Sequence, residues 1–140
     1  MEQRDYLMRQ IEQLGQVLAK MLARLLGIKQ KGSPSFGLEE LRQTYKNELD
    51  IDLEELIHIP ENDIIIFLKN KNKYFEHHLE MIADILHATA ENHYKNDRLD
   101  DGDNLLRKSI YILEYIHSTG KDFSIDRVSK IETLKDLLKK

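Results

Sequence analysis

The sequence predicts an all-α protein, a helical bundle with a long N-terminal amphipathic helix and one helical hairpin in its C-terminal half. Its 140 residues include only two prolines and six glycines, so the chain is poor in residues that interrupt helices. Apolar residues recur at spacings of three and four, which is the period of a helix face. With 41% hydrophobic and 33% charged residues, the composition is typical of one globular domain with charged helix surfaces.

Residues 1–29 form the first predicted helix, and we expect this helix to mediate self-association. Its apolar side chains alternate spacings of four and three, as in a coiled-coil seam about three heptads long. Leaving such a seam in water costs about 1.5 to 3 kcal/mol for each large side chain, so a partner must cover it. A symmetric homodimer is the simplest partner. The predicted self-association residues are Leu7, Ile11, Leu14, Leu18, Met21 and Leu25.

Charge also separates this helix from the rest of the chain. Residues 1–31 hold six Lys or Arg and three Asp or Glu, whereas the remainder holds 15 and 22, so the net charges are +3 and −7. This difference favours docking of the helix onto an acidic body, either its own or that of a second copy. We expect Leu14→Asp combined with Leu18→Asp to give monomer or aggregate.

Residues 30–37, QKGSPSFG, separate the first helix from a helical body that spans residues 38–140. A cluster of Gly, Ser and Pro is typical of a flexible hinge. In the body, periodicity predicts a helix from Leu38 to Leu49 and a shorter one from Leu53 that ends before the proline at position 60.

The apolar run Ile64–Leu68 fits either a buried strand or a short helix. We interpret it as a helix, because the chain offers no second strand to pair with it. Farther along, a helix is expected to begin at Ser124, with Phe123 and Val128 at the positions of a hydrophobic staple.

The apolar spacing in residues 74–117 predicts the hairpin. One helix is expected from about Tyr74 to Lys95 and another from about Asp100 to His117. Two antiparallel helices approach closely only where small residues meet, and Gly102 is expected to face Ala90 at the crossing. On that arrangement Gly102→Ala should be neutral or stabilising, because glycine inside a helix is about 1 kcal/mol worse than alanine. The predicted packing residues are Leu86, Ala90, Leu99, Gly102, Leu106 and Ser109.

The same small and bulky residues give residues 86–116 a resemblance to one tetratricopeptide repeat, the helix–turn–helix unit that stacks into solenoids. The chain contains no second copy at the repeat period of 34 residues, and about three repeats make a self-sufficient solenoid. The resemblance therefore implies a single repeat-like hairpin inside a helical domain and a role in binding proteins or peptides.

The N-terminal segment supports a second resemblance. Asp5-Tyr6 and Arg9 open a helix that ends in Ala23-Arg24-Leu25-Leu26, which is similar to the start of an uncharacterised bacterial family of small proteins. In that family a long first helix is followed by an acidic middle and a tetratricopeptide-like hairpin. The resemblance implies a fold and a bacterial cytoplasmic origin, and it brings no catalytic residue to this chain.

A stripe of ionisable residues on the predicted central helix, spaced by three and four, is the strongest candidate for chemistry. Asp84 and His87 reproduce the carboxylate-x-x-His spacing of bundle di-metal sites, and Glu114 and His117 repeat it on the neighbouring helix. We interpret the stripe as a solvated polar face, and a metal-binding bundle or an enzyme is the alternative. The stripe consists of His77, Glu80, Asp84, His87 and Glu91.

The expected function is therefore non-catalytic protein–protein interaction, without an enzyme activity or a cofactor. The chain has no cysteine, which excludes thiolate nucleophiles and Cys-based metal sites. Acidic residues fill the helix that a helix-turn-helix reader would place on DNA, so no nucleic-acid partner is expected. No apolar run reaches the roughly 20 residues of a membrane span, and we expect a cytoplasmic protein that does not bind membranes.

Overall fold

The computed structural model describes residues 2–30, 37–120 and 122–139. Helices account for 88% of these residues, and none of them lies in a strand. The predicted all-α bundle is confirmed. Six residues of the predicted hinge, 31–36, lie outside the described residues.

The structure contains seven α-helices and two short 3₁₀ helices within the described part of the chain. The interpretation of the run at 64–68 as a helix is confirmed, because it opens the fourth α-helix. In chain order the elements are α1 (Glu2–Gln30), α2 (Leu38–Leu49), α3 (Leu53–His58), η1 (Glu61–Asp63), α4 (Ile64–Lys71), η2 (Lys73–His78), α5 (Leu79–Lys95), α6 (Leu99–Thr119) and α7 (Ile125–Leu138).

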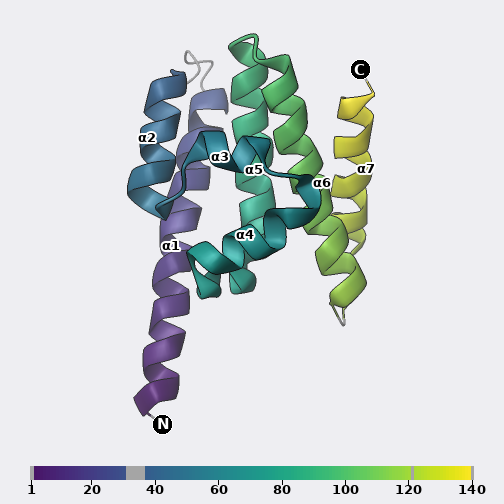
Figure 1. The fold of residues 1–140 in the computed structure, drawn as a ribbon. Coiled ribbons are helices and arrows are strands. Elements are labelled where there is room, and N and C mark those ends of the chain that lie inside the picture. The colour runs from purple at the N-terminus through teal and green to yellow at the C-terminus, as the bar shows by residue number, and fades with distance from the viewer. Residues whose placement is uncertain (1, 31–36, 121, 140) are drawn as a thin grey trace.

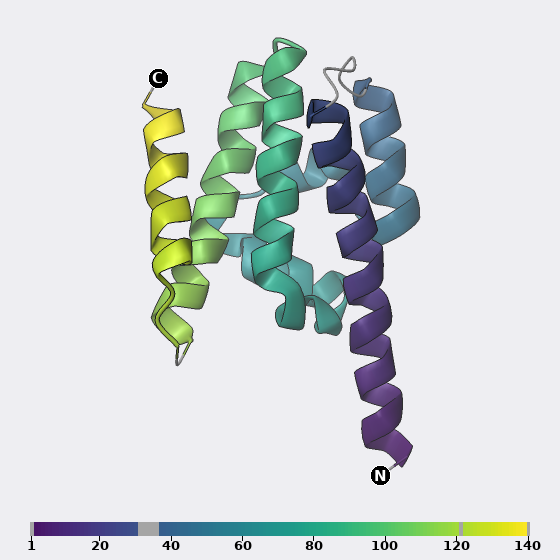
Figure 2. The ribbon, with the colours of Figure 1, turned by 180° about the vertical axis from the view of Figure 1, so that it is seen from behind.

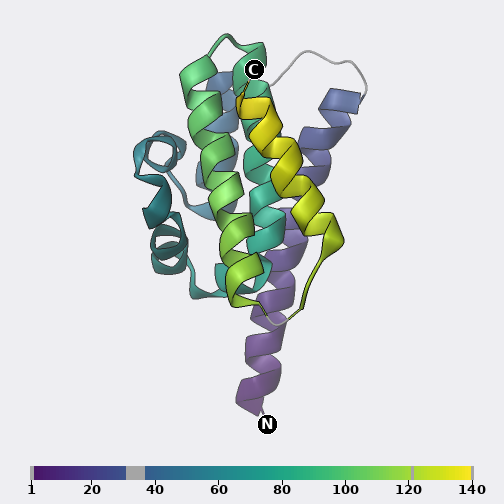
Figure 3. The same ribbon diagram turned by 90° about the vertical axis from the view of Figure 1, so that its right-hand side faces the viewer.

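The α5–α6 hairpin is the centre of the molecule (Figure 1). α1 packs against α5 on one side and α7 packs against α6 on the other, so these four helices form a row, which is also clear from behind (Figure 2). The segment from α3 to α4 covers one face of this row (Figure 3). Most of the core therefore lies between the hairpin, α1 and the covering segment.

Side-chain caps fix three of the helix starts. Asp52 Oδ1 accepts hydrogen bonds from the amides of Glu54 and Glu55 at the start of α3, at 3.0 and 3.3 Å. Asn72 caps η2 in the same way. Ser124 Oγ accepts from the amide of Arg127 at 3.1 Å, so α7 begins where the sequence predicts, since such a cap satisfies an amide that has no partner within the helix.

Buried polar side chains tie the layers together. Tyr45 on α2 and Thr89 on α5 share a hydrogen bond of 2.6 Å between their hydroxyl groups, and Thr89 also donates to the carbonyl of Ile85. Ser109 on α6 donates to the carbonyl of Ala83 on α5 at 2.7 Å. Because a buried polar group left unpaired costs about 1 to 3 kcal/mol, these bonds fix the relative position of the helices as well as stabilising them.

The helix content gives a first test of this fold. Far-ultraviolet circular dichroism should show more than about 60% helix, well above the third that is usual in globular proteins. A substantial strand signal would contradict the structure.

Candidate functional site

The N-terminal half of α1 projects beyond the body, whereas its C-terminal half is part of the core (Figures 1, 2 and 3). Leu18, Met21 and Leu25, three of the predicted self-association residues, are buried within the chain's own body, with at most 7% of each exposed. Leu7 is 42% exposed. The chain itself therefore covers half of the predicted seam.

Ile11 and Leu14 lie at the boundary between the two halves and are partly exposed. Here the His78 ring lies against α1: its Nε2 donates to the carbonyl oxygen of Ile11 at 2.8 Å, and a Cβ on Gly15 would stand 2.9 Å from its Cε1. A larger residue at position 15 would have to displace the His78 ring. This contact sets where α1 leaves the body. Neither His78 nor Gly15 was among the predicted site residues.

Beyond that contact, residues 3–9 are all exposed. Three of them carry large apolar side chains, namely Tyr6, Leu7 and Met8, which are 57%, 42% and 51% exposed. Monomeric proteins seldom leave neighbouring large apolar side chains in water without a partner. We name these three residues, together with Ile11 and Leu14, the arm surface.

The polar stripe of α5 is not a solvated face, and that expectation is wrong for its central residues. Arg127 Nε lies 2.8 Å from a carboxylate oxygen of Glu80, and Lys130 Nζ lies 3.3 Å from one of Asp84. Both cations belong to α7, which crosses the hairpin (Figure 3). The carboxylates therefore help to hold α7 in place.

The rest of the stripe does not assemble a metal centre within the described residues. His87 Nε2 lies 2.8 Å from a carboxylate oxygen of Glu91 on the same helix, and His77 is exposed. Glu114 on α6 pairs with Lys135 at 3.0 Å. No group of three or more His, Asp or Glu in the described part of the chain is placed to share an ion.

The predicted hairpin residues divide into two groups. Leu86, Ala90, Leu106 and Ser109 are at most 1% exposed and pack where α5 and α6 meet. Leu99 is 60% exposed, so its assignment to the packing was wrong: it is the first residue of α6 and its side chain lies outside the contact.

Gly102 is buried as predicted, but it faces Tyr94 and not Ala90. A Cβ on Gly102 would stand 2.6 Å from Cε1 of the Tyr94 ring. The ring is held in place because its hydroxyl donates to Asp103 Oδ1 at 2.5 Å. The expectation that Gly102→Ala is harmless is therefore wrong.

We now expect Gly102→Ala to lower the free energy of unfolding by about 1 to 3 kcal/mol, the usual cost of an overpacked core. Gly27→Ala in α1 is the matched control, because a Cβ there meets nothing within 4 Å, and it should be neutral or stabilising by up to about 1 kcal/mol. Urea denaturation measures both. Equal effects at the two glycines would contradict the close contact with Tyr94.

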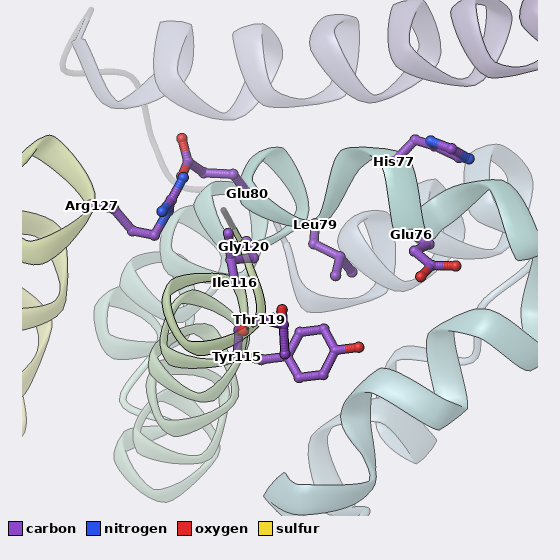
Figure 4. A pocket seen from close by; sticks show the side chains of 9 residues that line it. All are labelled: Glu76, His77, Leu79, Glu80, Tyr115, Ile116, Thr119, Gly120 and Arg127. Carbon is purple, nitrogen blue, oxygen red and sulfur yellow. Dashed lines mark hydrogen bonds and ion pairs between the residues drawn. The ribbon is translucent and has the colours of Figure 1, made fainter. Parts of the chain in front are cut away.

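A cleft of about 350 Å³ opens where η2, α5, α6 and α7 meet. Figure 4 shows Glu80 and Arg127 pointing toward each other at one end, with Leu79 near the middle. Arg127 is 14% exposed, and the hydroxyl of Thr119 donates to the carbonyl of Tyr115 at 2.7 Å. The cleft is thus lined by both polar and apolar groups, and the ion pair between Glu80 and Arg127 lies at one end of it.

Sequence reasoning missed Arg127 and Lys130 because their partners lie 47 and 46 residues away along the chain, respectively. Their spacing of three on a helix is a usable signal, since it places both cations on one face. The opposing carboxylates have the spacing of four that matches such a face.

Among the described residues, no helix is both long and apolar enough to cross a lipid bilayer. No protein-family model, curated protein or solved structure matches this chain.

Proposed function

We propose that this protein is a non-catalytic interaction protein that forms a homodimer through the arm surface. The observation that carries the proposal is the division of the α1 seam into a buried and an uncovered half. The body buries Leu18 and leaves Leu7 and Met8 in water, although all three belong to one apolar stripe. A stripe that continues from a packed interface onto an open surface indicates that the packing continues with a partner.

A second copy of the chain fits this surface because the arm complements itself. In an antiparallel pair of arms that cross near Met8, Arg4 of one copy lies beside Glu12 of the other, and the two-fold axis makes this ion pair twice. A parallel pair would place Arg4 against Arg4, since this residue stands one heptad before Ile11 on the seam. Like charges facing each other are unfavourable, so the antiparallel pair is the proposed one.

The size of the arm adds a further requirement. Residues 2–11 extend about 15 Å at 1.5 Å per residue, which is short for an interface of the standard size of about 1,600 Å². In an antiparallel dimer each arm reaches the other copy's body near η2 and adds area there.

The α5–α6 hairpin supplies the scaffold, and we propose that it is a single tetratricopeptide-like unit. In support, Ala90 and Ser109 are completely buried where the two helices meet, and α7 packs on α6 as the first helix of a following repeat would. The proposal includes the bacterial cytoplasmic setting that the resemblance of the N-terminal segment implies.

The competing function is metal binding by the stripe from His77 to Glu91. The ion pairs of Glu80 and Asp84 with α7 oppose it, because a metal would have to displace both cations. We therefore expect His87→Ala to change the free energy of unfolding by about 0.5 kcal/mol, the usual contribution of a pair spaced by four on one helix. Elemental analysis of purified protein decides between the two functions: stoichiometric iron, manganese or zinc that disappears in His87→Ala would establish the competing one.

Light scattering of the purified chain at micromolar concentration tests the dimer. The wild-type protein should have twice the mass of one chain, and Leu7→Asp should have the mass of one chain while keeping its helix content. Gln13→Asp is the matched control, because it adds the same charge to an exposed position of the same helix, away from the seam. A monomeric wild type, or a dimer that survives Leu7→Asp, would refute the proposal.

A further inference from the structure

A second, smaller cleft of about 210 Å³ lies between the α3–η1 turn and α6. Its wall includes the turn residues from Ile57 to Glu61 and three polar residues of α6, namely Asn104, Arg107 and Lys108. The cleft is smaller than the roughly 300 to 1,000 Å³ of sites for drug-sized ligands, so it has room only for a small ion or one functional group.

Lys108 forms the floor of this cleft and is 3% exposed. Its Nζ donates to the carbonyl oxygen of Ile57 at 2.8 Å, one of the carbonyls that the last turn of α3 leaves without a helical partner. An ammonium group has three N–H donors, and this bond uses one of them. Within the described part of the chain, no carboxylate forms an ion pair with Lys108.

A buried ammonium group is costly unless it is paired, and Lys108 is paired with a neutral carbonyl only. Burial lowers the pKa of Lys108, the positive charge of Arg107 lowers it further, and the carboxylate of Glu61 partly opposes them. Burial and Arg107 together therefore disfavour the charged form of Lys108 more than Glu61 favours it.

Arg107 extends the positive charge to the rim of the cleft. Its Nη1 donates to Asn104 Oδ1 at 3.2 Å, and its side chain is exposed, so its remaining N–H groups are accessible from solvent. Glu61 is the one carboxylate in the wall, which leaves Arg107, Lys108 and Glu61 with a net charge of +1. His58, also in the wall, has its Nδ1 2.7 Å from the carbonyl oxygen of Glu54.

We infer that this cleft binds a small anionic group, a phosphate or a carboxylate, with Lys108 beneath it and Arg107 at its rim. The anion would occupy the free ammonium donors and balance the buried charge, and Arg107 offers the planar fork of donors that suits such oxygens. The site is independent of the arm surface, so it stands or fails separately from the proposed dimer.

Titration of the ¹⁵N-labelled full chain with inorganic phosphate, and separately with acetate, tests the site by nuclear magnetic resonance. We expect saturable amide shifts confined to residues 57–61 and 104–108, and the tighter-binding ion identifies the group. Lys108→Met should weaken binding at least tenfold, and Arg107→Gln should weaken it less. Glu61→Gln should strengthen binding, because it removes the carboxylate that lies in the wall of the cleft.

Lys135→Met is the matched control, since Lys135 pairs with Glu114 on a different part of α6, and its affinity should equal that of the wild type. If Lys108→Met fails to fold, the opposite effects of Arg107→Gln and Glu61→Gln, both at exposed residues, still decide the question. The absence of saturable shifts with either ion would overturn the inference, as would equal affinity in the variants and the wild type.

Discussion

Leu18→Asp should unfold the protein. Leu18 is completely buried between α1 and the body, and the substitution both removes its apolar contacts and buries a carboxylate without a partner. Each effect belongs to the class that costs several kcal/mol, and their sum approaches the total stability of 5 to 15 kcal/mol that is usual for a domain. Urea denaturation followed by circular dichroism measures the loss, which we expect to exceed about 4 kcal/mol.

The same change at Leu7 provides the comparison, since Leu7 is 42% exposed on the same stripe. Leu7→Asp should preserve the fold of the single chain. It should lower the free energy of unfolding only by the contribution of the dimer contact. Equal destabilisation by the two substitutions would show that α1 packs along its whole length, contrary to the structure. The double change Leu14→Asp and Leu18→Asp cannot separate these effects, because it damages the core and the arm surface together.

Phe75→Ala should be the most damaging truncation of a core side chain, with a loss of about 3 to 5 kcal/mol. Phe75 is 1% exposed, although it lies in the short 3₁₀ helix η2. Together with Tyr45 from α2, Leu68 from α4 and Leu86 from α5, it surrounds a small apolar void. Its ring therefore joins four elements, and its removal enlarges a cavity that none of them can fill without moving.

Phe123→Ala is the control for this prediction, because Phe123 is 71% exposed before α7. Its loss should stay within about 0.5 kcal/mol, as for other surface substitutions. A thermal unfolding series on the two variants and the wild type measures both effects. Similar midpoints for Phe75→Ala and the wild type would contradict the position of η2.

The helices could be predicted from the sequence because apolar spacing and helix caps act over a few residues. The start of α7 at its Ser124 cap is an example. The start of α5 is different: the spacing predicted a helix from Tyr74, whereas Lys73–His78 forms a 3₁₀ helix and α5 begins at Leu79. Apolar spacing did not distinguish these two helix types, since Phe75 is buried in either.

Contacts between distant segments could not be predicted in this way. The heptad seam of α1 is uniform in sequence, and nothing in it shows that the body covers Leu18 and leaves Leu7 exposed. The same holds for Gly102, whose neighbour is the Tyr94 ring eight residues earlier and not the small residue that the hairpin model placed there. Small size was correctly interpreted as a close approach, but its partner depends on how the turn directs the two helices.

The stripe on α5 shows the same limit for the candidate site. Its spacing correctly placed Glu80 and Asp84 on one helix face, but whether that face meets water, a metal or another helix depends on α7. The cations Arg127 and Lys130 on α7 pair with the two carboxylates.

Disulfide trapping at Met8 tests the central proposal, that the projecting halves of α1 from two copies pair antiparallel, most directly. The chain has no cysteine, so any disulfide in Met8→Cys must join two copies at this position. Residue 8 lies beside the proposed two-fold axis. Ile66→Cys on α4 is the control, because Ile66 is 62% exposed and lies outside the arm surface. Under mild oxidation at micromolar concentration, Met8→Cys should convert rapidly and almost completely to a linked dimer while Ile66→Cys stays largely monomeric; equal, slow linkage of the two variants would contradict the proposal.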